Sequence, residues 1–340
     1  MKKFIRYCVA VISLFAVSTS SFSQENVKIA VGSFNLNNVP YYVALGLHAF
    51  DKEGLKVSSE NFGGGGSTTL QALLTGSIDL AIGFYDHTIQ LQSKGKDLVA
   101  IVQLARNSGL VLAVGNNVSS RYPDTKSVLA NAKLLKFGIT SPGSSSDFFL
   151  RYLLTRHGID PADVQMIAVG SGQAAVAALK QGNIDVLVNY DPAATLLTRA
   201  KIGKILIDAR TDEGAKEVYG GIYPTSTIYT TGRFIATKKD IAQKVASAMV
   251  KTLHWMSEHT PEEVAKVIPT EYKSGDTASY VEALGNAKTL FSRNGEFVPQ
   301  DLETPYKVLQ AFSAQVKNHP VDLKKTYTNE FVNKANREIK

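Results

Sequence analysis

Short apolar runs alternate along the chain with longer stretches in which apolar residues recur every three or four positions. The short runs are typical of strands, and a recurrence of about 3.6 residues is typical of amphipathic helices. The first series predicts strands at Val27–Val31, Leu55–Ser58, Ile78–Ile82, Leu98–Leu104 and Leu110–Val114, and helices over 41–53, 67–75 and 87–94. The second predicts strands at Leu135–Ile139, Gln165–Val169, Ile184–Val188 and Lys204–Ile207, and helices near 146–157, 173–181 and 192–200. This alternation indicates an α/β fold with mostly parallel sheets flanked by helices.

Beyond residue 235 the pattern becomes mainly helical. Apolar residues recur at helical spacing through Lys238–Glu258, and then through 261–267, 276–291 and 301–316. We expect a helix in each of these segments.

The two series are related to each other. Gly66–Asp79 aligns without a gap with Gly172–Asp185, and in each copy a glycine opens a helix, Gly76 or Gly182 ends it, and Ile-Asp begins a strand. Because glycine often follows a helix in the left-handed conformation, any strand-helix-strand unit can show this pattern. Both copies also continue into similar strand exits, which favours two equivalent lobes that face each other through equivalent loops.

Residues 1–23 have the three-part pattern of a secretory signal peptide. Met1–Arg6 is basic, Tyr7–Val17 is an apolar run too short to span a bilayer, and Ser18–Ser23 is small and polar. We expect cleavage after Ser23 and a periplasmic mature chain; the alternative is a short hydrophobic first strand. The only cysteine, Cys8, lies in this segment, so the mature chain has no cysteine nucleophile, thiolate metal site or disulfide.

Composition narrows the class of protein further. The 340 residues are 44% hydrophobic and 20% charged, as in a globular chain long enough for two domains. The formal net charge of +7 falls to +4 when Lys2, Lys3 and Arg6 leave with the signal peptide. The remaining basic residues form no run, so we expect no nucleic-acid partner. We also expect a monomer.

Sequence signatures of catalysis and of metal binding are missing. The chain has no HExxH, GxSxG or GxxxxGK[ST] motif, and its six histidines lack metal-ligand spacing and are interpreted as surface or interfacial residues. We therefore expect no catalytic residue, metal or cofactor. Gly170–Ala175 matches the GxGxxA dinucleotide pattern but lies in mid-chain, outside a first strand-helix-strand unit. What remains is a glycine-rich turn at a helix start, whose free N–H groups suit a small anionic or strongly polar group.

Three such turns occur, at Gly63–Thr69, Ser141–Asp147 and Gly170–Gln173. Taken singly, each turn can be explained as a helix cap, and so can Asp86 and Asp191. Their matching positions after strands favour a shared ligand cleft, because ligands of open α/β sheets bind outside the carboxyl ends of the strands. Aromatic residues follow strand ends in both series and can wall such a cleft or pack at its rim. The three turns contain no Arg or Lys, which favours a ligand bound by neutral donors and aromatic rings.

The motifs taken together resemble those of a known family. They are Val27–Gly32, Pro40–Gly46, Phe50–Leu55, Gly66–Ser67, Leu74–Asp79, Gly143–Ser144, Arg151–Leu154, Gly158–Val164 and Arg233–Thr237. This set, spread over 27–270, resembles the substrate-binding proteins of nitrate, taurine and aliphatic-sulfonate ABC importers, a group that includes binders of thiamine-precursor pyrimidines. Beyond 270 we recognise only a generic helical tail.

The resemblance implies a two-lobed type II periplasmic-binding fold with the ligand cleft between the lobes. One lobe would comprise 25–113 plus 215–340 and the other 114–214, joined by crossings near 113–116 and 210–220, and the lobes would close on the ligand by a hinge motion. The implied ligand contacts are Phe34, Asn35, Asn37, Gly65, Gly66, Ser67, Thr68, Phe84, Tyr85, Asp86, Ser141, Gly143, Ser144, Ser145, Ser171, Gln173, Asn189, Tyr190 and Asp191.

The same resemblance implies a partner and limits the ligand. The closed protein would deliver a small molecule to an ABC permease that works with a cytoplasmic ATPase, and it would do no chemistry itself. The run Phe84-Tyr85-Asp86-His87 departs from the family's anion binders. Carboxylates near the cleft disfavour a bare anion such as nitrate, so the ligand is a sulfonate- or taurine-like anion or an aromatic or heterocyclic compound.

Two alternatives stay open at the level of the sequence. One is a sensory binding protein that reports its ligand to a membrane receptor. The other is an enzyme on the same fold. The related pyrimidine synthases rely on a cysteine-rich stretch that the mature chain lacks, and menaquinone-pathway enzymes of similar fold are cytosolic, which the signal peptide opposes.

Overall fold

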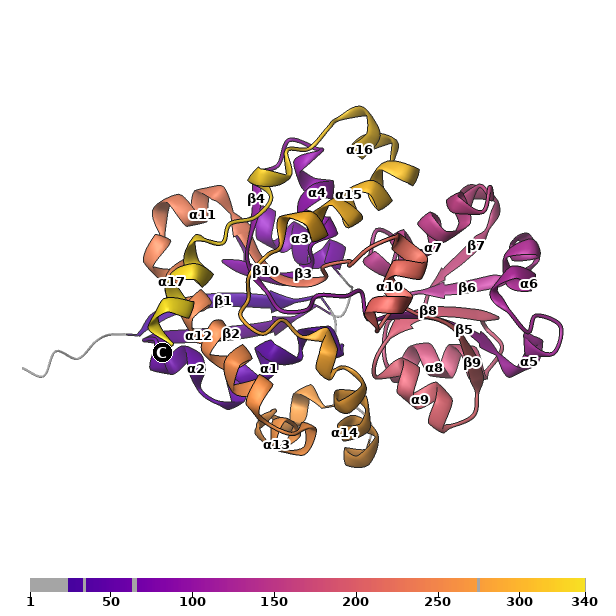
Figure 1. The fold of residues 1–340 in the computed structure, drawn as a ribbon, viewed down its shortest axis with the longest axis horizontal. Coiled ribbons are helices and arrows are strands. Elements are labelled where there is room, and N and C mark those ends of the chain that lie inside the picture. The colour runs from indigo at the N-terminus through magenta and orange to yellow at the C-terminus, as the bar shows by residue number, and fades with distance from the viewer. Residues whose placement is uncertain (1–23, 33–34, 63–65, 274–275, 340) are drawn as a thin grey trace, which may run out of the picture.

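The computed structural model describes residues 24–32, 35–62, 66–273 and 276–339. The expected signal peptide and the predicted site residues Phe34 and Gly65 lie outside the described residues, and of Gly66 and Ser67 only the backbone is described. Two α/β lobes lie side by side, each built around one sheet (Figure 1).

The first sheet has the order β2-β1-β3-β10-β4. Its strands are β1 (Glu25–Val31), β2 (Leu55–Asn61), β3 (Leu80–Phe84), β4 (Leu98–Gln103) and β10 (Ser226–Thr231). β1 pairs in parallel with β2 and β3, whereas β10 runs antiparallel to β3 and β4.

The second sheet repeats this order as β7-β6-β8-β5-β9. Its strands are β5 (Leu110–Gly115), β6 (Lys136–Ile139), β7 (Gln165–Ala168), β8 (Val186–Tyr190) and β9 (Gly203–Asp208). The two aligned sequence segments form α3 (Gly66–Leu74) and α8 (Gln173–Lys180), which lead into the central strands β3 and β8. The equivalence of the two lobes that the alignment favours is therefore present in the topology.

Both sheets are mixed: four strands of each run in the same direction, and β10 or β5 runs antiparallel to both of its neighbours. The reason is topological. β5 and β10 are the strands through which the chain enters a lobe, so they start at the lobe interface and run away from it. β1, β3, β6 and β8 run toward the interface and end there.

The remaining helices cover the two sheets. Before residue 200 they are α1 (Val39–Gly46), α2 (Ala49–Lys52), α4 (Asp86–Gln92), α5 (Asn116–Ser119), α6 (Thr125–Ala130), α7 (Ser145–Arg156) and α9 (Ala193–Arg199). After it they are α10 (Asp212–Tyr219), α11 (Gly232–Thr237), α12 (Lys239–Glu258), α13 (Pro261–Val267), α14 (Thr277–Asn286), α15 (Pro299–Phe312), α16 (Ala314–Asn318) and α17 (Glu330–Glu338).

The chain crosses between the lobes at 104–109 and at 209–225. β5 pairs only within the second sheet, so the first crossing lies before Leu110, earlier than the expected 113–116. α10 packs Ala215 and Val218 into the apolar cluster that holds most of the second lobe.

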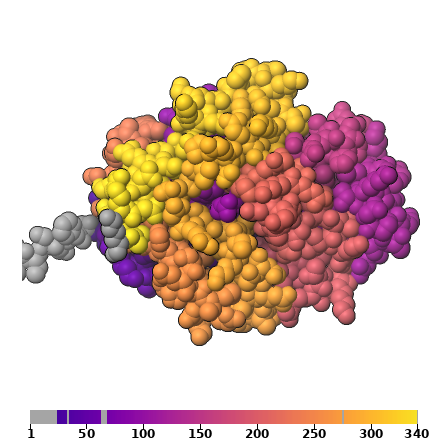
Figure 2. Space-filling view, viewed as in Figure 1, coloured from indigo at the N-terminus to yellow at the C-terminus, as the bar shows by residue number. Residues whose placement is uncertain are grey.

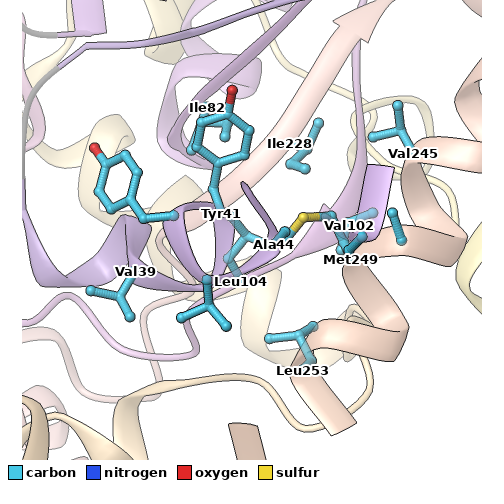
Figure 3. Packing of buried hydrophobic residues seen from close by; sticks show 14 of the residues in the cluster. Val39, Tyr41, Ala44, Ile82, Val102, Leu104, Ile228, Val245, Met249 and Leu253 are labelled. Carbon is cyan, nitrogen blue, oxygen red and sulfur yellow. The ribbon is translucent and has the colours of Figure 1, made fainter. Parts of the chain in front are cut away.

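Alternating side chains give the first sheet two apolar faces. Ile29, Ile82 and Ile228 point to the face that α1 and α12 cover, where Tyr41 and Met249 join them (Figure 3). Ala30 and Ala81 point to the opposite face, which α3, α4 and α15 cover. Because both faces of this sheet are buried, the site at its strand ends stands on a rigid support.

Helix α15 belongs to both lobes. Its Leu302 and Leu309 are buried in a cluster of the first lobe, and its Val308 is buried in the main cluster of the second. Phe312 at its end lies 5.7 Å from Phe148 of α7, measured between ring centroids. The helical tail beyond 270 thus joins the lobes.

Candidate ligand-binding site

The carboxyl ends of strands from both lobes enclose a small cavity of about 30 Å³. In open α/β sheets ligands bind at this position. The first lobe contributes Gly32, Asn35, Asn38, Ile82, Gly83, Phe84 and His87, and the second contributes Thr140, Ser144, Ser145, Ser146 and Tyr190. No Lys or Arg occurs among these described lining residues.

A larger cavity of about 950 Å³ lies elsewhere, between α10, the loop 288–298 and helices α12–α14. Figure 2 shows it as a hollow in the middle of the face, between α10 and the helices of the tail. No strand of either lobe ends in it except β4 at Gln103. We therefore take the smaller cavity as the candidate ligand-binding site.

The first turn of α7 gives this cavity a cluster of hydroxyl groups. Thr140 Oγ1 lies 2.7 Å from Ser144 Oγ and 2.8 Å from Ser146 Oγ, and the two serine oxygens are 2.9 Å apart. Ser144 caps the helix by accepting from the backbone N–H of Asp147. Hydroxyl donors and a helix N-terminus together suit an acceptor atom of a ligand.

Direct contacts across the cavity hold the lobes together. The backbone N–H of Leu36 donates to the carbonyl of Asp191 at 3.0 Å, and the rings of Phe84 and Tyr190 lie 6.2 Å apart. Ser145 of the second lobe donates its hydroxyl to Asp86 of the first at 2.9 Å. The cleft is thus closed in this structure.

Asp86 is the first residue of α4 and is completely buried. Instead of capping its helix, its carboxylate accepts hydrogen bonds from Ser145 and, at 2.9 Å, from the Tyr223 hydroxyl in the second crossing. Burial raises the pKa of Asp86, and the neighbouring His87 and the two hydroxyl donors oppose that shift. A carboxylate in this position is costly to ionise because no cation pairs with it closely.

His87 is the buried base of the site. Its Nδ1 lies 3.5 Å from the Tyr229 hydroxyl, and its Nε2 has no hydrogen-bond partner among the described residues. We assign the tautomer in which the Tyr229 hydroxyl donates to Nδ1. The ring hydrogen of His87 is then on Nε2. Burial lowers the pKa of His87, so the ring is a neutral donor at pH 7.

The arginine side chains near the cleft form ion pairs with aspartates of the protein. Arg151 pairs with Asp147 on α7 at 2.7 Å. Arg210 pairs with Asp191 at 3.0 Å and with Asp208 at 2.6 Å. Asp191 also accepts from the backbone N–H and hydroxyl of Thr195 in the first turn of α9, although the N-cap residue of that helix is Pro192 and not the expected Asp191.

The predicted contacts divide into three groups. Asn35, Phe84, Ser144, Ser145 and Tyr190 line the cavity, and Asp86 lies directly behind it. Ser141, Gly143, Ser171 and Asp191 lie in the loops that follow strands of the second lobe. Asn189 lies in β8 and donates to the carbonyl of Gly170. The others occupy different places: Asn37 bonds the crossings, Tyr85 bonds Thr326 in the first lobe, and Thr68 and Gln173 are exposed.

Sequence reasoning left out several residues that line the cavity, among them Asn38, His87, Thr140 and Ser146. Their positions in the sequence could have identified them, because each directly neighbours a predicted site residue at a strand end or a helix start. Residue type alone could not find them, because serine and threonine in such turns are common caps.

The described residues give no sign of a metal centre or a membrane span. They hold no group of three or more His, Cys, Asp or Glu side chains arranged to bind a metal ion. None of the helices in the described ranges has the length and apolar character needed to cross a bilayer.

A model of the NMT1-like family matches residues 23–269, and the chain belongs to this family. YtlA of Bacillus subtilis (strain 168) is 25% identical over 278 residues, which cover 79% of this chain and 78% of that protein. The bicarbonate-binding protein CmpA of Synechococcus elongatus is 30% identical over 115 residues, 33% of this chain and 24% of that protein. The resemblance indicated by the sequence motifs is confirmed.

Solved structures agree on the fold. A protein of Bordetella bronchiseptica RB50 is 33% identical and superposes with a TM-score of 0.87, covering 93% of this chain and 98% of that chain. The periplasmic nitrate-binding protein NrtA of Synechocystis PCC 6803 has a TM-score of 0.75 at 15% identity, covering 93% and 89%. The periplasmic aliphatic sulphonate binding protein SsuA of Escherichia coli has a TM-score of 0.65 at 19% identity, covering 90% and 99%. The expected two-lobed periplasmic-binding fold is confirmed.

Proposed function

We propose that this chain is an exported solute-binding protein that captures a small organic ligand between its lobes and delivers it to an ABC permease. The observation that carries the proposal is the cavity at the strand ends, to which both lobes contribute donors and aromatic rings. The named relatives bind small solutes, and a binding role needs no catalytic group.

The proposal includes a movement of the lobes. Residues 25–109 with most of the chain after 225 form one body, 110–208 with α10 form the other, and the two crossings act as the hinge. Opening breaks the Ser145–Asp86 hydrogen bond and admits the ligand; closure presents both lobes to a permease that works with a cytoplasmic ATPase. The signal peptide places the mature protein in the periplasm, where it acts as a monomer.

Thermal unfolding of residues 24–340 against a ligand panel tests ligand capture. The panel contains taurine, alkanesulfonates, nitrate, aromatic carboxylates, pyrimidines and flavins. A ligand at about 100 times its dissociation constant adds about 2.7 kcal/mol to the free energy of unfolding, which raises Tm by several degrees. No shift with any compound, together with no small molecule released from the denatured protein, would contradict the proposal.

The Ser144→Phe variant tests the place of binding, because the larger side chain fills the cavity. We expect it to fold and to lose the ligand-induced shift. Thr260→Phe is the matched control, since it also removes a capping hydroxyl but at an exposed helix start that does not line the cavity. A full shift in Ser144→Phe would show that the ligand binds elsewhere.

A further inference from the structure

A buried carboxyl group lies one hydroxyl group away from the cavity. Asp86 is completely buried, and Ser145, whose hydroxyl donates to it at 2.9 Å, lines the cavity. Tyr223 holds the second carboxylate oxygen at the same distance. Asp86 is therefore fixed between the lobes, where it cannot turn away from a bound ligand.

Among its described neighbours, no Lys or Arg pairs with this carboxyl group. The titratable groups that face Asp86 are His87 of α4, Tyr219 of α10, Tyr223 of the second crossing and Tyr229 of β10. Burial holds the three phenols in their neutral form, and it favours the neutral form of the His87 ring, whose Nε2 lies 3.8 Å from Asp86 Oδ1.

The guanidinium nearest along the packed face of α7 is that of Arg151, and Asp147 occupies it at 2.7 Å. Arg210 is likewise held by Asp191 and Asp208. An anion in the cavity would thus be buried near an unpaired carboxylate, which costs free energy because the interior screens charges weakly.

Resting on the function proposed above, we propose that Asp86, both of whose oxygens accept from hydroxyl groups, is ionised at neutral pH. The charge makes the cavity selective for an uncharged solute that carries an amide-type N–C=O group, as in amides, ureides and pyrimidine lactams, and makes it reject oxyanions. A carbonyl oxygen accepts from the α7 hydroxyls and from His87 Nε2 without adding charge. The adjoining N–H donates to a hydroxyl or amide oxygen of the lining.

The size and walls of the cavity suit the same group. About 30 Å³ exceeds the space of a single water and admits the edge of a planar polar group. Phe84 and Tyr190, inclined at 48° to each other, supply apolar ring surface beside it. In this proposal, oxyanions are rejected because the carboxylate of Asp86 repels them. The neutral ligand needs no additional contact that an oxyanion could not make.

Calorimetric titration of two probe sets tests the selectivity. The neutral set is urea, acetamide, nicotinamide and uracil; the anionic set is nitrate, bicarbonate and methanesulfonate. In the unmodified protein we expect at least one neutral probe to bind, and every anion to bind at least tenfold more weakly. Asp86→Asn keeps the shape and removes the charge, so it should gain at least tenfold in affinity for an anion.

Asp147→Asn is the matched control, since it removes a buried carboxylate of α7 that Arg151 already neutralises. We expect no gain of anion affinity from it. A second readout needs no variant: anion affinity in the unmodified protein should rise as pH falls, because a proton neutralises Asp86, and the rise should be absent in Asp86→Asn. Protonation of His87 in the lining would give a similar rise, so only its absence in Asp86→Asn assigns the rise to Asp86. No rise in the unmodified protein would contradict the proposal even if Asp86→Asn does not fold.

The outcomes separate the two proposals. If the unmodified protein binds an anion more tightly than every neutral probe, with no rise at lower pH, the selectivity is overturned and ligand capture stands. If no probe binds to any variant and no small molecule is released on denaturation, ligand capture is overturned, and the selectivity with it.

Discussion

Single polar side chains connect the crossings to the first lobe. Asn37 Nδ2 donates to the carbonyl of Ser108 in the first crossing and to Thr225 Oγ1 in the second, at 3.0 and 3.1 Å. Thr225 in turn donates to the carbonyl of Asn107. Asn37 therefore lies at the hinge of the two lobes, where a buried amide fixes both connecting segments at once.

Gly109→Ala tests this packing at the hinge. Gly109 has a φ of +64°, and a Cβ there would lie 2.6 Å from Asn37 Oδ1. We expect a loss of about 1–3 kcal/mol from backbone strain, plus the cost of displacing Asn37. Gly220→Ala is the control because its φ is +79° with open space around a Cβ. Equal losses in urea unfolding would show that the Asn37 contact contributes nothing.

The residue scale is also where sequence reasoning reaches its limit. The turn Ser141–Asp147 could be predicted as a site because its residue types and its place after a strand are local information. The role of Asp86 could not, because its partners Ser145 and Tyr223 are 59 and 137 positions away along the chain. The local pattern predicts an N-cap, and the tertiary contact prevails over it.

Among the elements, β10 shows why hydrophobic patterns miss some strands. Its sequence is short and rich in hydroxyls, yet it lies between β3 and β4 and is almost fully buried. The hydroxyls find partners there: Ser226 donates to Asn38 Oδ1 and Thr230 donates to the carbonyl of Asp79. Polar residues that are satisfied inside a sheet leave no apolar signal in the sequence.

Arg210 connects two elements of the second lobe, the end of β9 and the start of α9. Its Asp191 partner is 3% exposed, so Arg210→Ala leaves a buried charge without a cation. We expect a loss of about 3 kcal/mol in the free energy of unfolding. Arg199→Ala is the control, because Arg199 and Glu282 are both near half exposed and their pair contributes at most about 1 kcal/mol. Similar losses in the two variants would contradict a structural role for Arg210.

The same cluster gives a pH dependence. Burial acts to raise the pKa of Asp208, but the hydrogen bonds and charge of Arg210 outweigh it and hold the pKa below its usual range. The stabilisation is therefore present above the unfolded pKa of about 3.9 and is lost as pH falls through the folded value. Arg210→Ala should lose less stability than the unmodified protein between pH 5 and the acid range, as followed by urea unfolding at each pH.

At the scale of the whole molecule, the tail is the part that sequence analysis described least well. The resemblance covered 27–270, and the helices beyond it were expected but not placed. α14 and α15 proved to reach the second lobe, through the Arg199–Glu282 pair and the Phe148–Phe312 contact. Helical periodicity indicates an apolar face, but it does not indicate which sheet that face will cover.

Val308 and Leu309 let the two sides of α15 be tested separately, since each is buried in a different cluster. We expect Leu309→Ala to cost about 2–5 kcal/mol and Val308→Ala somewhat less. Calorimetry of either variant should show a single transition at a lower Tm. Two separate transitions, with only one of them shifted, would mean that the lobes unfold independently.

The position of α15 has a consequence for how the chain reaches its native state. A chain that ends at Val298 lacks Leu302 and Leu309 of one cluster and Val308 of the other. We therefore expect both lobes to reach their full stability only after the last helices have been made. Such dependence on the C-terminus favours late, cooperative folding over folding segment by segment from the N-terminus.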